Sequence, residues 1–119
     1  SSYMFITLVL QNTVSDCAHQ QLGKPYVYGA AGPDSFDCSG LVQYCYKKAG
    51  KSVPRVAKDQ CNYGSAVSEK SAKAGDIVCF NQPSASHVGI FLGINSMIHA
   101  PHTGDVVKKS NYKWSGSTK

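Results

Sequence analysis

Apolar residues recur at helical spacing in the first half of the chain. One helix is predicted to end at Gly23, because a glycine followed by Lys24-Pro25 is a common helix stop. Whether the apolar run at residues 5–10 extends this helix or forms a separate strand is left open by its short, β-rich composition. The residues that define the helical face are Val14, Cys17, Ala18 and Leu22.

A second helix is predicted to begin at Asp37 or Cys38 and to stop at Gly50. Aspartate is a favoured N-cap residue, because its carboxylate accepts hydrogen bonds from the first backbone N–H groups of a helix. Residues 26–36 are expected to form a loop, since they contain two glycines and a proline. The predicted inward face of the second helix carries Cys38, Leu41, Val42, Cys45 and Ala49.

After Gly75 the pattern changes to short apolar or β-branched runs separated by turn residues, which is typical of strands. Helices followed by a run of strands favour an α+β fold over alternating βαβ units. We therefore expect N-terminal helices packed on an antiparallel β-sheet. The predicted strands are residues 76–81, 87–94, 96–100 and 105–109.

The chain of 119 residues fits one compact domain, and its 42% hydrophobic and 16% charged content is that of a globular protein. Residues 4–10 are apolar but too few to span a bilayer, so no transmembrane segment is expected. They also lack the basic start and the cleavage site of a signal peptide. Residues 1–3 could be an expression remnant ahead of a native Met4.

The formal net charge of +5 favours an anionic partner such as a cell wall, a nucleic acid or a lipid surface. The basic residues are scattered, however, and only Lys47-Lys48 and Lys108-Lys109 are adjacent. No pattern of stacking aromatic and basic residues is present, so we expect no nucleic-acid partner. We interpret the charge as a solvated positive face.

The five cysteines are too sparse and too irregular for a disulfide scaffold, and they contain no C-x-x-C pair. Their odd number leaves at least one thiol free unless it pairs with another chain. Cys17, Cys45, Cys61 and Cys79 are interpreted as inert core residues whose redox state the sequence leaves open.

Cys38 is the candidate nucleophile, because a thiol in the first turn of a helix lies at the positive end of the macrodipole. We expect its pKa to be lowered there, which would make thiolate available near neutral pH. His87 is the candidate base, and His99 on the following strand is placed to orient its imidazole. The alternative for Cys38 is an inert core cysteine. His19 and His102 are expected to be polar surface residues.

Several blocks of the sequence then resemble the NlpC/P60 cysteine peptidases, which have a papain-like fold. Residues 23–29 (GKPYVYG) and 36–42 (FDCSGLV) look like the nucleophile region of that family. Residues 75–78 (GDIV) resemble the entry to its first sheet strand. Residues 86–93 (SHVGIFLG) and 97–101 (MIHAP) resemble its strands for the catalytic histidine and the third catalytic residue. The blocks occur in the order and at the separations of the family.

This resemblance implies roles for the matching residues. Cys38 would be the nucleophile, His87 the general base and acid, and His99 the group that orients the imidazole. Tyr26 would lie beside the nucleophile and help to stabilise the oxyanion together with backbone N–H groups at the helix start. The alternative for Tyr26 is packing within its loop.

The residues around the nucleophile are implied to bind substrate. Asp37 and Ser39 would contact the free amine of an N-terminal L-alanine, although Asp37 could serve only as the N-cap. Ser86 precedes the catalytic histidine and is assigned to substrate binding. Arg55, which follows a proline, lies in a segment that resembles the family loop after the nucleophile helix.

The resemblance further implies hydrolysis of peptidoglycan stem peptides, commonly between D-glutamate and the diamino acid, by a secreted or extracytoplasmic enzyme. We expect no SH3-like or other wall-binding domain of the kind that many relatives carry, and the basic surface could partly substitute for one. We expect a monomer with no cofactor and no metal.

Three other functions remain open from the sequence. The first is an amidase or an acyltransferase on the same scaffold, since a fold does not fix the acyl acceptor. The second is a metal-binding module that uses Cys38, His87, His99 and His102, although the spacings match no compact zinc pattern. The third is a non-catalytic protein that binds cell wall or neutralises a toxin.

Overall fold

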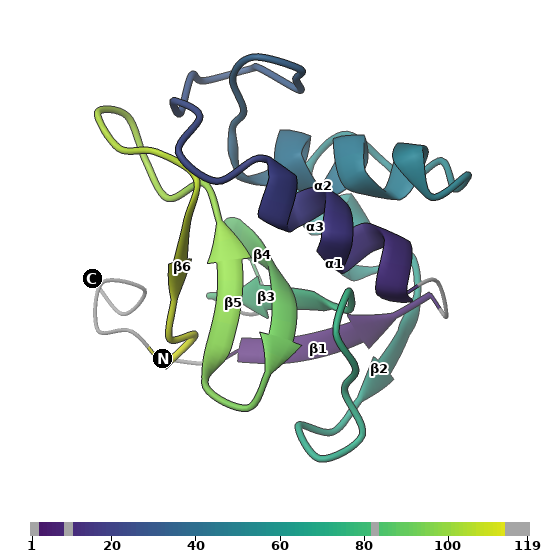
Figure 1. Ribbon diagram of the computed structural model, residues 1–119. Helices are drawn as coiled ribbons and strands as arrows, with labels where there is room; N and C mark the ends of the chain where they lie inside the picture. The colour runs from purple at the N-terminus through teal and green to yellow at the C-terminus, as the bar shows by residue number, and fades with distance from the viewer. Residues whose placement is uncertain (1–2, 9–10, 82–83, 114–119) are drawn as a thin grey trace.

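A computed structural model describes residues 3–8, 11–81 and 84–113 of the chain (Figure 1). In this part of the chain, an antiparallel six-stranded sheet has the order β2-β1-β3-β4-β5-β6. The strands are β1 (Tyr3–Thr7), β2 (Ser65–Val67), β3 (Ile77–Phe80), β4 (His87–Gly93), β5 (Ser96–His99) and β6 (Lys108–Ser110). The helices are α1 (Gln11–Gln20), α2 (Cys38–Lys48) and α3 (Ala57–Cys61). The predicted α+β class is confirmed.

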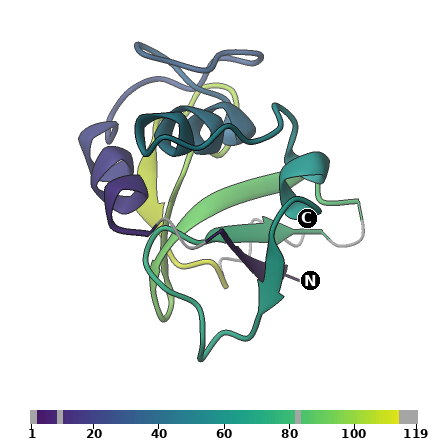
Figure 2. The same ribbon diagram turned by 90° about the vertical axis from the view of Figure 1, so that its right-hand side faces the viewer.

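The described helices cover one face of the sheet (Figures 1 and 2). α1 and α2 pack against each other and on β4, whereas α3 packs on β3 and β4. Alternate residues of β3 point to opposite faces, as the two-residue period of a strand requires. Ile77 and Cys79 join the core beneath the helices, and Val78 and Phe80 join a smaller aromatic cluster on the other face. The central strands are therefore buried on both faces.

The apolar run near the N-terminus is a strand and not an extension of the first helix. β1 lies between β2 and β3, with Phe5 opposite Val67 on one side and opposite Val78 on the other. Residues 9–10, the end of the apolar run, lie outside the described residues, as do residues 1–2 of the suggested remnant. The first element of the sheet therefore precedes the helices in the chain.

α1 begins at Gln11 and ends at Gln20, earlier than the apolar pattern predicted. Val14, Cys17 and Ala18 are buried as expected, but Leu22 is 39% exposed, so its assignment to the buried face is wrong. The reason is that the backbone turns after the helix, where the N–H of Leu22 donates to the carbonyl of His19. Leu22 fits the helical spacing of apolar residues in the sequence, but the helix has already ended at Gln20.

α2 forms where the sequence predicted it. Asp37 is the N-cap, and its carboxylate accepts a hydrogen bond from the N–H of Gly40. The inward residues Leu41, Val42 and Cys45 are fully buried. The helix ends at Lys48, and Gly50 adopts a φ of 88°, which is unfavourable for residues with a Cβ.

The segment between α2 and β3 contains structure that the sequence analysis missed. α3 and β2 are only five and three residues long, and neither was predicted. The predicted last strand at residues 105–109 is displaced to Lys108–Ser110. The described residues contain no helix that is long and apolar enough to cross a membrane.

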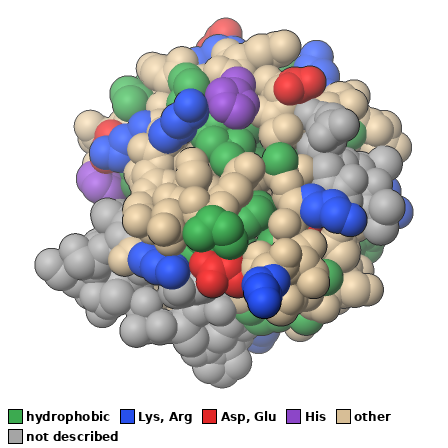
Figure 3. Space-filling view, turned by 60° about the horizontal axis from the view of Figure 1, so that its bottom comes forward, with side chains coloured by type: hydrophobic (Ala, Val, Ile, Leu, Met, Phe, Trp, Pro, Cys, Tyr) green, Lys and Arg blue, Asp and Glu red, His purple; other side chains and the backbone are tan. Residues whose placement is uncertain are grey.

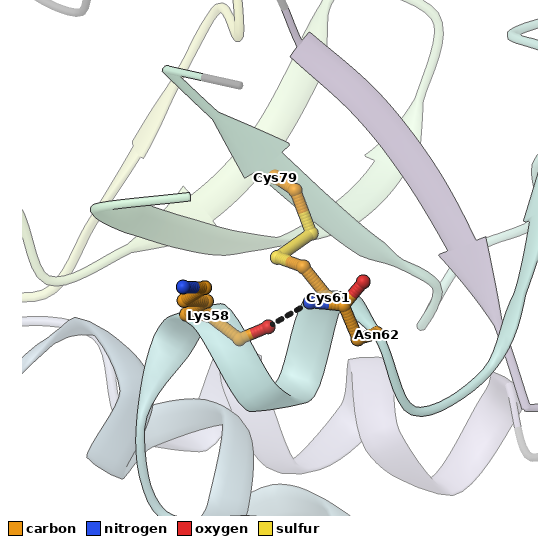
Figure 4. Close-up of a disulfide and its surroundings, with 4 residues drawn as sticks. All are labelled: Lys58, Cys61, Asn62 and Cys79. Atoms are coloured by element: carbon orange, nitrogen blue, oxygen red, sulfur yellow. Dashed lines mark hydrogen bonds between the residues drawn. A yellow bond between two sulfur atoms is a disulfide. The ribbon is translucent and has the colours of Figure 1, made fainter. Parts of the chain in front are cut away.

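A disulfide joins Cys61 at the end of α3 to Cys79 of β3 (Figure 4). Both cysteines belong to the core, as interpreted from the sequence, and their redox state, which the sequence left open, is that of a disulfide. Cys17 and Cys45 are free and buried, and Cys38 is free and partly exposed. At the end of the same short helix, the side-chain amide of Asn62 donates to the carbonyl of Lys58 at 2.9 Å. The disulfide and this hydrogen bond hold a helix that is too short to be stable alone.

Candidate active site

Cys38 is the first residue of α2 and lines an open surface pocket of about 420 Å³. The Asp37 cap fixes the start of the helix, so the thiol is held at its N-terminal end. The pocket brings together all of the residues to which the sequence analysis gave substrate roles. It is lined by Tyr26, Tyr28, Gly29, Asp37, Cys38, Ser39, Arg55, Val56, Ala57 and Ser86.

A relay of two histidines and a serine lies on the adjoining strands. His87 begins β4, and its Nε2 lies 2.8 Å from Nδ1 of His99, the last residue of β5. His99 Nε2 in turn lies 3.0 Å from the hydroxyl oxygen of Ser110 on β6. The sequence analysis paired the two histidines but missed Ser110. A lone serine at the end of a short strand carries no sequence signal for such a role.

The close pairing of the histidines depends on Gly89. A Cβ added at this position would lie 3.2 Å from the Cβ of His99 and 2.8 Å from the sulfur of Met97. Glycine therefore lets β5 approach β4 at the point where the second imidazole is needed. The side chain of His87, two residues earlier on β4, lies on the face of the sheet where a side chain at position 89 would lie.

The thiol of Cys38 reaches the strand that carries His87. α2 packs on β4, and a backbone hydrogen bond from Val88, the residue after His87, reaches the Cys38 sulfur. This contact brings the candidate nucleophile and the candidate base to the same end of β4. His102, in contrast, has a 66% exposed side chain, and His19 is exposed on α1, as predicted for both.

Burial raises the pKa of the Cys38 thiol, and the negative charge of Asp37 adds to this effect. The expected lowering of this pKa is therefore wrong. Hydrogen bonds from backbone N–H groups of Val88, Ser39 and Cys38 favour the thiolate, but burial outweighs them. At neutral pH the resting site therefore favours an uncharged thiol.

Burial also keeps the two imidazoles uncharged. It lowers the pKa of His87 to about 4, with a smaller contribution from the charge of His102. Burial, with a smaller contribution from the neighbouring His87, lowers the pKa of His99 to about 3. Both histidines are therefore neutral above about pH 5, which leaves His87 able to accept a proton.

Asp37 is the centre of an ion pair beside the nucleophile. Its two carboxylate oxygens accept from Nη1 and Nη2 of Arg55 at 3.1 and 2.9 Å, in a bidentate arrangement. The N–H groups of Gly40 and Gly29 also donate to it, at 2.7 and 2.9 Å. Burial opposes ionisation of Asp37, but these hydrogen bonds outweigh it and hold its pKa below the ordinary value.

Ser39 belongs to the same group. Its hydroxyl accepts from Nη1 of Arg55 at 2.9 Å and lies 3.3 Å from Oδ1 of Asp37. Gln60 of α3 holds the backbone beside Asp37, Ser39 and Arg55 in place, because its side-chain amide donates to the carbonyls of both Ser39 and Pro54 at 2.9 Å. The sequence analysis gave Arg55 only by resemblance and did not identify Gln60.

Tyr26 and Ser86 lie at the edges of the pocket. Tyr26 is partly buried, and burial raises the pKa of its hydroxyl, as do the neighbouring Cys38 and Asp37. Ser86 is exposed, and its hydroxyl accepts from the Asn81 amide at 2.8 Å. Tyr28, which the sequence analysis did not single out, is 86% exposed at the rim of the pocket.

The described residues hold no group of three or more His, Cys, Asp or Glu side chains that could bind a metal ion. The view in Figure 3 shows lysine and arginine side chains separated by neutral and acidic ones on that face. The positive charge is thus dispersed on the face shown.

Comparison with known proteins identifies the family. The sequence profile of the NlpC/P60 family matches residues 23–119. A probable endopeptidase of Corynebacterium glutamicum is 45% identical over 87 residues, which cover 73% of this chain and 41% of that protein. The probable endopeptidase p60 of Listeria monocytogenes is 45% identical over 100 residues, which cover 83% of this chain and 20% of that protein. The chain thus spans less than half the length of these curated relatives.

Solved structures agree with this assignment. The NlpC/p60 domain of the peptidoglycan hydrolase SagA superposes with a TM-score of 0.79 at 36% identity, covering 86% of this chain and 89% of that one. The peptidoglycan hydrolase RipB from Mycobacterium tuberculosis superposes with a TM-score of 0.75 at 34% identity, covering 87% and 59% of the two chains. With its sequence profile and its fold in agreement, this chain belongs to the NlpC/P60 family.

Proposed function

We propose that this chain is a cysteine endopeptidase that hydrolyses peptidoglycan stem peptides at the bond between γ-D-glutamate and the diamino acid. The observation that carries the proposal is the position of Cys38, at a helix start in an open pocket, next to the strand that carries the paired imidazoles of His87 and His99. Relatives named as endopeptidases and as peptidoglycan hydrolases support the substrate class. Action on that substrate implies an extracytoplasmic location.

In this mechanism Nδ1 of His87 takes the proton from the Cys38 thiol, because Nε2 of His87 is hydrogen-bonded to His99. In the resting enzyme the hydrogen of His87 is on Nε2, and this N–H group donates a hydrogen bond to Nδ1 of His99. His99 must carry its own hydrogen on Nε2, which donates to the hydroxyl of Ser110. The relay thereby selects one tautomer of each imidazole and directs the basic nitrogen of His87 toward the thiol.

Proton transfer accompanies attack of the sulfur on the carbonyl carbon, since both groups are uncharged at rest. The tetrahedral oxyanion is stabilised by backbone N–H groups at the start of α2 and by the hydroxyl of Tyr26. The imidazolium of His87 next protonates the leaving amine of the diamino acid, which leaves a thioester on Cys38. His87 then deprotonates a water that hydrolyses the thioester and restores the thiol.

In the same proposal Asp37 and Ser39 bind the free amine of an N-terminal L-alanine, and Ser86, which lines the same pocket, contacts the peptide. The carboxylate of Asp37 already accepts from Arg55, Gly29 and Gly40. A substrate amine would therefore replace one of these donors. Equal rates for the free and the N-acetylated peptide would leave Asp37 only its roles as N-cap and as partner of Arg55.

The test is mass spectrometry of the products from L-Ala–γ-D-Glu–diaminopimelate, with wild type and with Cys38→Ala. Release of the L-Ala–D-Glu dipeptide by wild type alone supports the proposed bond and nucleophile. Cleavage of an intact muropeptide at the lactyl–L-Ala amide would assign an amidase instead. Formation of a new amide with an added amine in place of hydrolysis would assign an acyltransferase.

A further inference from the structure

Two buried thiols outside the candidate active site lie on the helices α1 and α2, which pack against each other. Cys17 of α1 and Cys45 of α2 belong to the same core cluster, and each is the largest influence on the pKa of the other thiol. Both belong to the main core cluster, with 6% and 0% of their surface exposed, and neither takes part in the Cys61–Cys79 disulfide. Cys45 lies two helical turns after Cys38, about 10 Å along the axis, so the pair is separate from the nucleophile.

Cys17 is the member of the pair that solvent can reach. It lines a surface pocket of about 350 Å³, together with Gln21, Tyr44 and Lys48. The amide of Gln21 lies 3.8 Å from its sulfur. The hydrogen bond from Cys45 lowers the pKa of Cys17 against the effect of burial, and Gln21 and the charge of Lys48 lower it further. The pKa of Cys45 is raised by its contact with Cys17 and by burial.

We propose that Cys17 and Cys45 form an oxidisable dithiol that closes to a second disulfide and links α1 to α2. The five cysteines then divide into two bonded pairs and one thiol, Cys38. An environment that maintains the Cys61–Cys79 bond can also oxidise a second pair of thiols that lie in one helix–helix interface and interact with each other. Closure therefore leaves the candidate nucleophile as the single free thiol of the chain.

The oxidant required is a small disulfide, of which oxidised glutathione is an example. The Cys17 thiolate attacks one of its sulfurs, the small disulfide bond breaks, and one glutathione thiolate leaves. Cys45 then loses its proton to solvent and attacks the sulfur of Cys17, which releases the second glutathione. Two cysteine thiols lose two electrons in total, and one small disulfide is reduced to two thiols.

The link would restrain a functional part of the chain. Cys17 and Cys45 are 28 positions apart, and the enclosed segment contains the loop with Tyr26 and the start of α2 with Cys38. Closing a loop of this length restricts the unfolded chain, so oxidation should raise the thermal stability. The chain would retain its catalytic thiol and gain resistance to unfolding under oxidising conditions.

The experiment uses the Cys38→Ala variant, which keeps the pair and removes the competing thiol. The matched control is Cys38→Ala/Cys17→Ser, and Cys38→Ala/Cys45→Ser serves as a second control. Each protein is kept with or without oxidised glutathione and then alkylated in denaturant. Intact mass and chymotryptic mapping follow, with thermal unfolding of parallel samples.

After oxidation, Cys38→Ala is expected to take up no alkyl group and no glutathione, and to contain a Cys17–Cys45 cross-link. Its Tm should rise by about 5 °C or more, whereas each control carries one reactive thiol or one glutathione and shows no such rise. Two alkylated thiols in oxidised Cys38→Ala would overturn the proposal. So would one glutathione on each of the two cysteines, or a cross-link of Cys45 to Cys61 or Cys79.

Discussion

Removal of the Cys61–Cys79 disulfide should destabilise the chain by an amount that follows from its position. The bond joins residues 18 positions apart, and cross-linking a loop of that size reduces the entropy of the unfolded chain by about 11 cal/mol/K. This corresponds to about 3 kcal/mol at 25 °C. Replacing the buried Cys61 and Cys79 by alanine also removes two packed sulfur atoms, so the total loss should exceed that figure.

Urea unfolding of wild type and of Cys61→Ala/Cys79→Ala, with and without dithiothreitol, separates the two contributions. Without reductant, the free energy of unfolding of the double variant should be lower than that of wild type by roughly 3 kcal/mol or more. The urea midpoint of the double variant should therefore be lower by about 1–3 M. With reductant the unfolded wild type loses its cross-link, so only the smaller packing difference should remain. Any contribution from Cys17 and Cys45 is present in both proteins and cancels.

The same difference with and without reductant would refute this reasoning, because it would assign the whole effect to packing. A difference below about 0.5 kcal/mol without reductant would mean that no disulfide forms.

Removal of the disulfide should also affect the candidate active site. Cys61 ends the helix that carries Gln60, and Gln60 holds the carbonyls of Ser39 and Pro54. A fall in kcat/KM is therefore expected together with the loss of stability.

Three further predictions concern the candidate site. His99→Ala should lower kcat/KM for the stem tripeptide by about 10–100-fold, because the hydrogen bond from His87 Nε2 that selects its tautomer is lost, and His99→Asn should recover part of the loss. Equal activity of His99→Ala and wild type would exclude the relay. Because His87 must be neutral to accept a proton and its pKa is about 4, kcat/KM should persist to low pH and fall as pH drops through about 4. A fall centred near pH 6.5 would contradict the lowered pKa. Arg55→Ala should lower the free energy of unfolding by about 1–2 kcal/mol, a figure reduced for the partial exposure of the pair with Asp37, and Arg55→Lys should restore only part because it lacks the bidentate fork. Identical urea midpoints for Arg55→Lys and wild type would show that the fork contributes nothing.

The sequence predicted those parts of the site whose signals are local. The start of α2 was predictable because Asp37 is an N-cap and the apolar period begins directly after it. The pairing of His87 with His99 was predictable because two strands joined by a short turn must be neighbours. These predictions need only the spacing of residues along one segment.

The remaining parts depend on contacts between distant segments. α3 is a single turn held by a disulfide and by Gln60, so it has no periodic pattern of its own to detect. Arg55 is hydrogen-bonded to Asp37, 18 residues away in the sequence, and Ser110 is hydrogen-bonded to His99 across a loop. Local sequence propensities do not predict such contacts.

The pKa of Cys38 was wrongly predicted for a related reason. The position of the thiol at a helix start is visible in the sequence and favours thiolate. The degree of its burial, which has the opposite and larger effect, depends on how α2 packs on β4. Burial is a property of the assembled fold.

The central claim of this account is that Cys38 becomes acylated during turnover, and rapid acid quench of the reaction with L-Ala–γ-D-Glu–diaminopimelate tests it most directly. Intact mass spectrometry should show wild type carrying one L-Ala–D-Glu acyl group, mapped to the peptide that contains Cys38, and Cys38→Ala carrying none. Dipeptide release by Cys38→Ala, or an acyl group on another residue, would contradict the assignment of Cys38 as nucleophile.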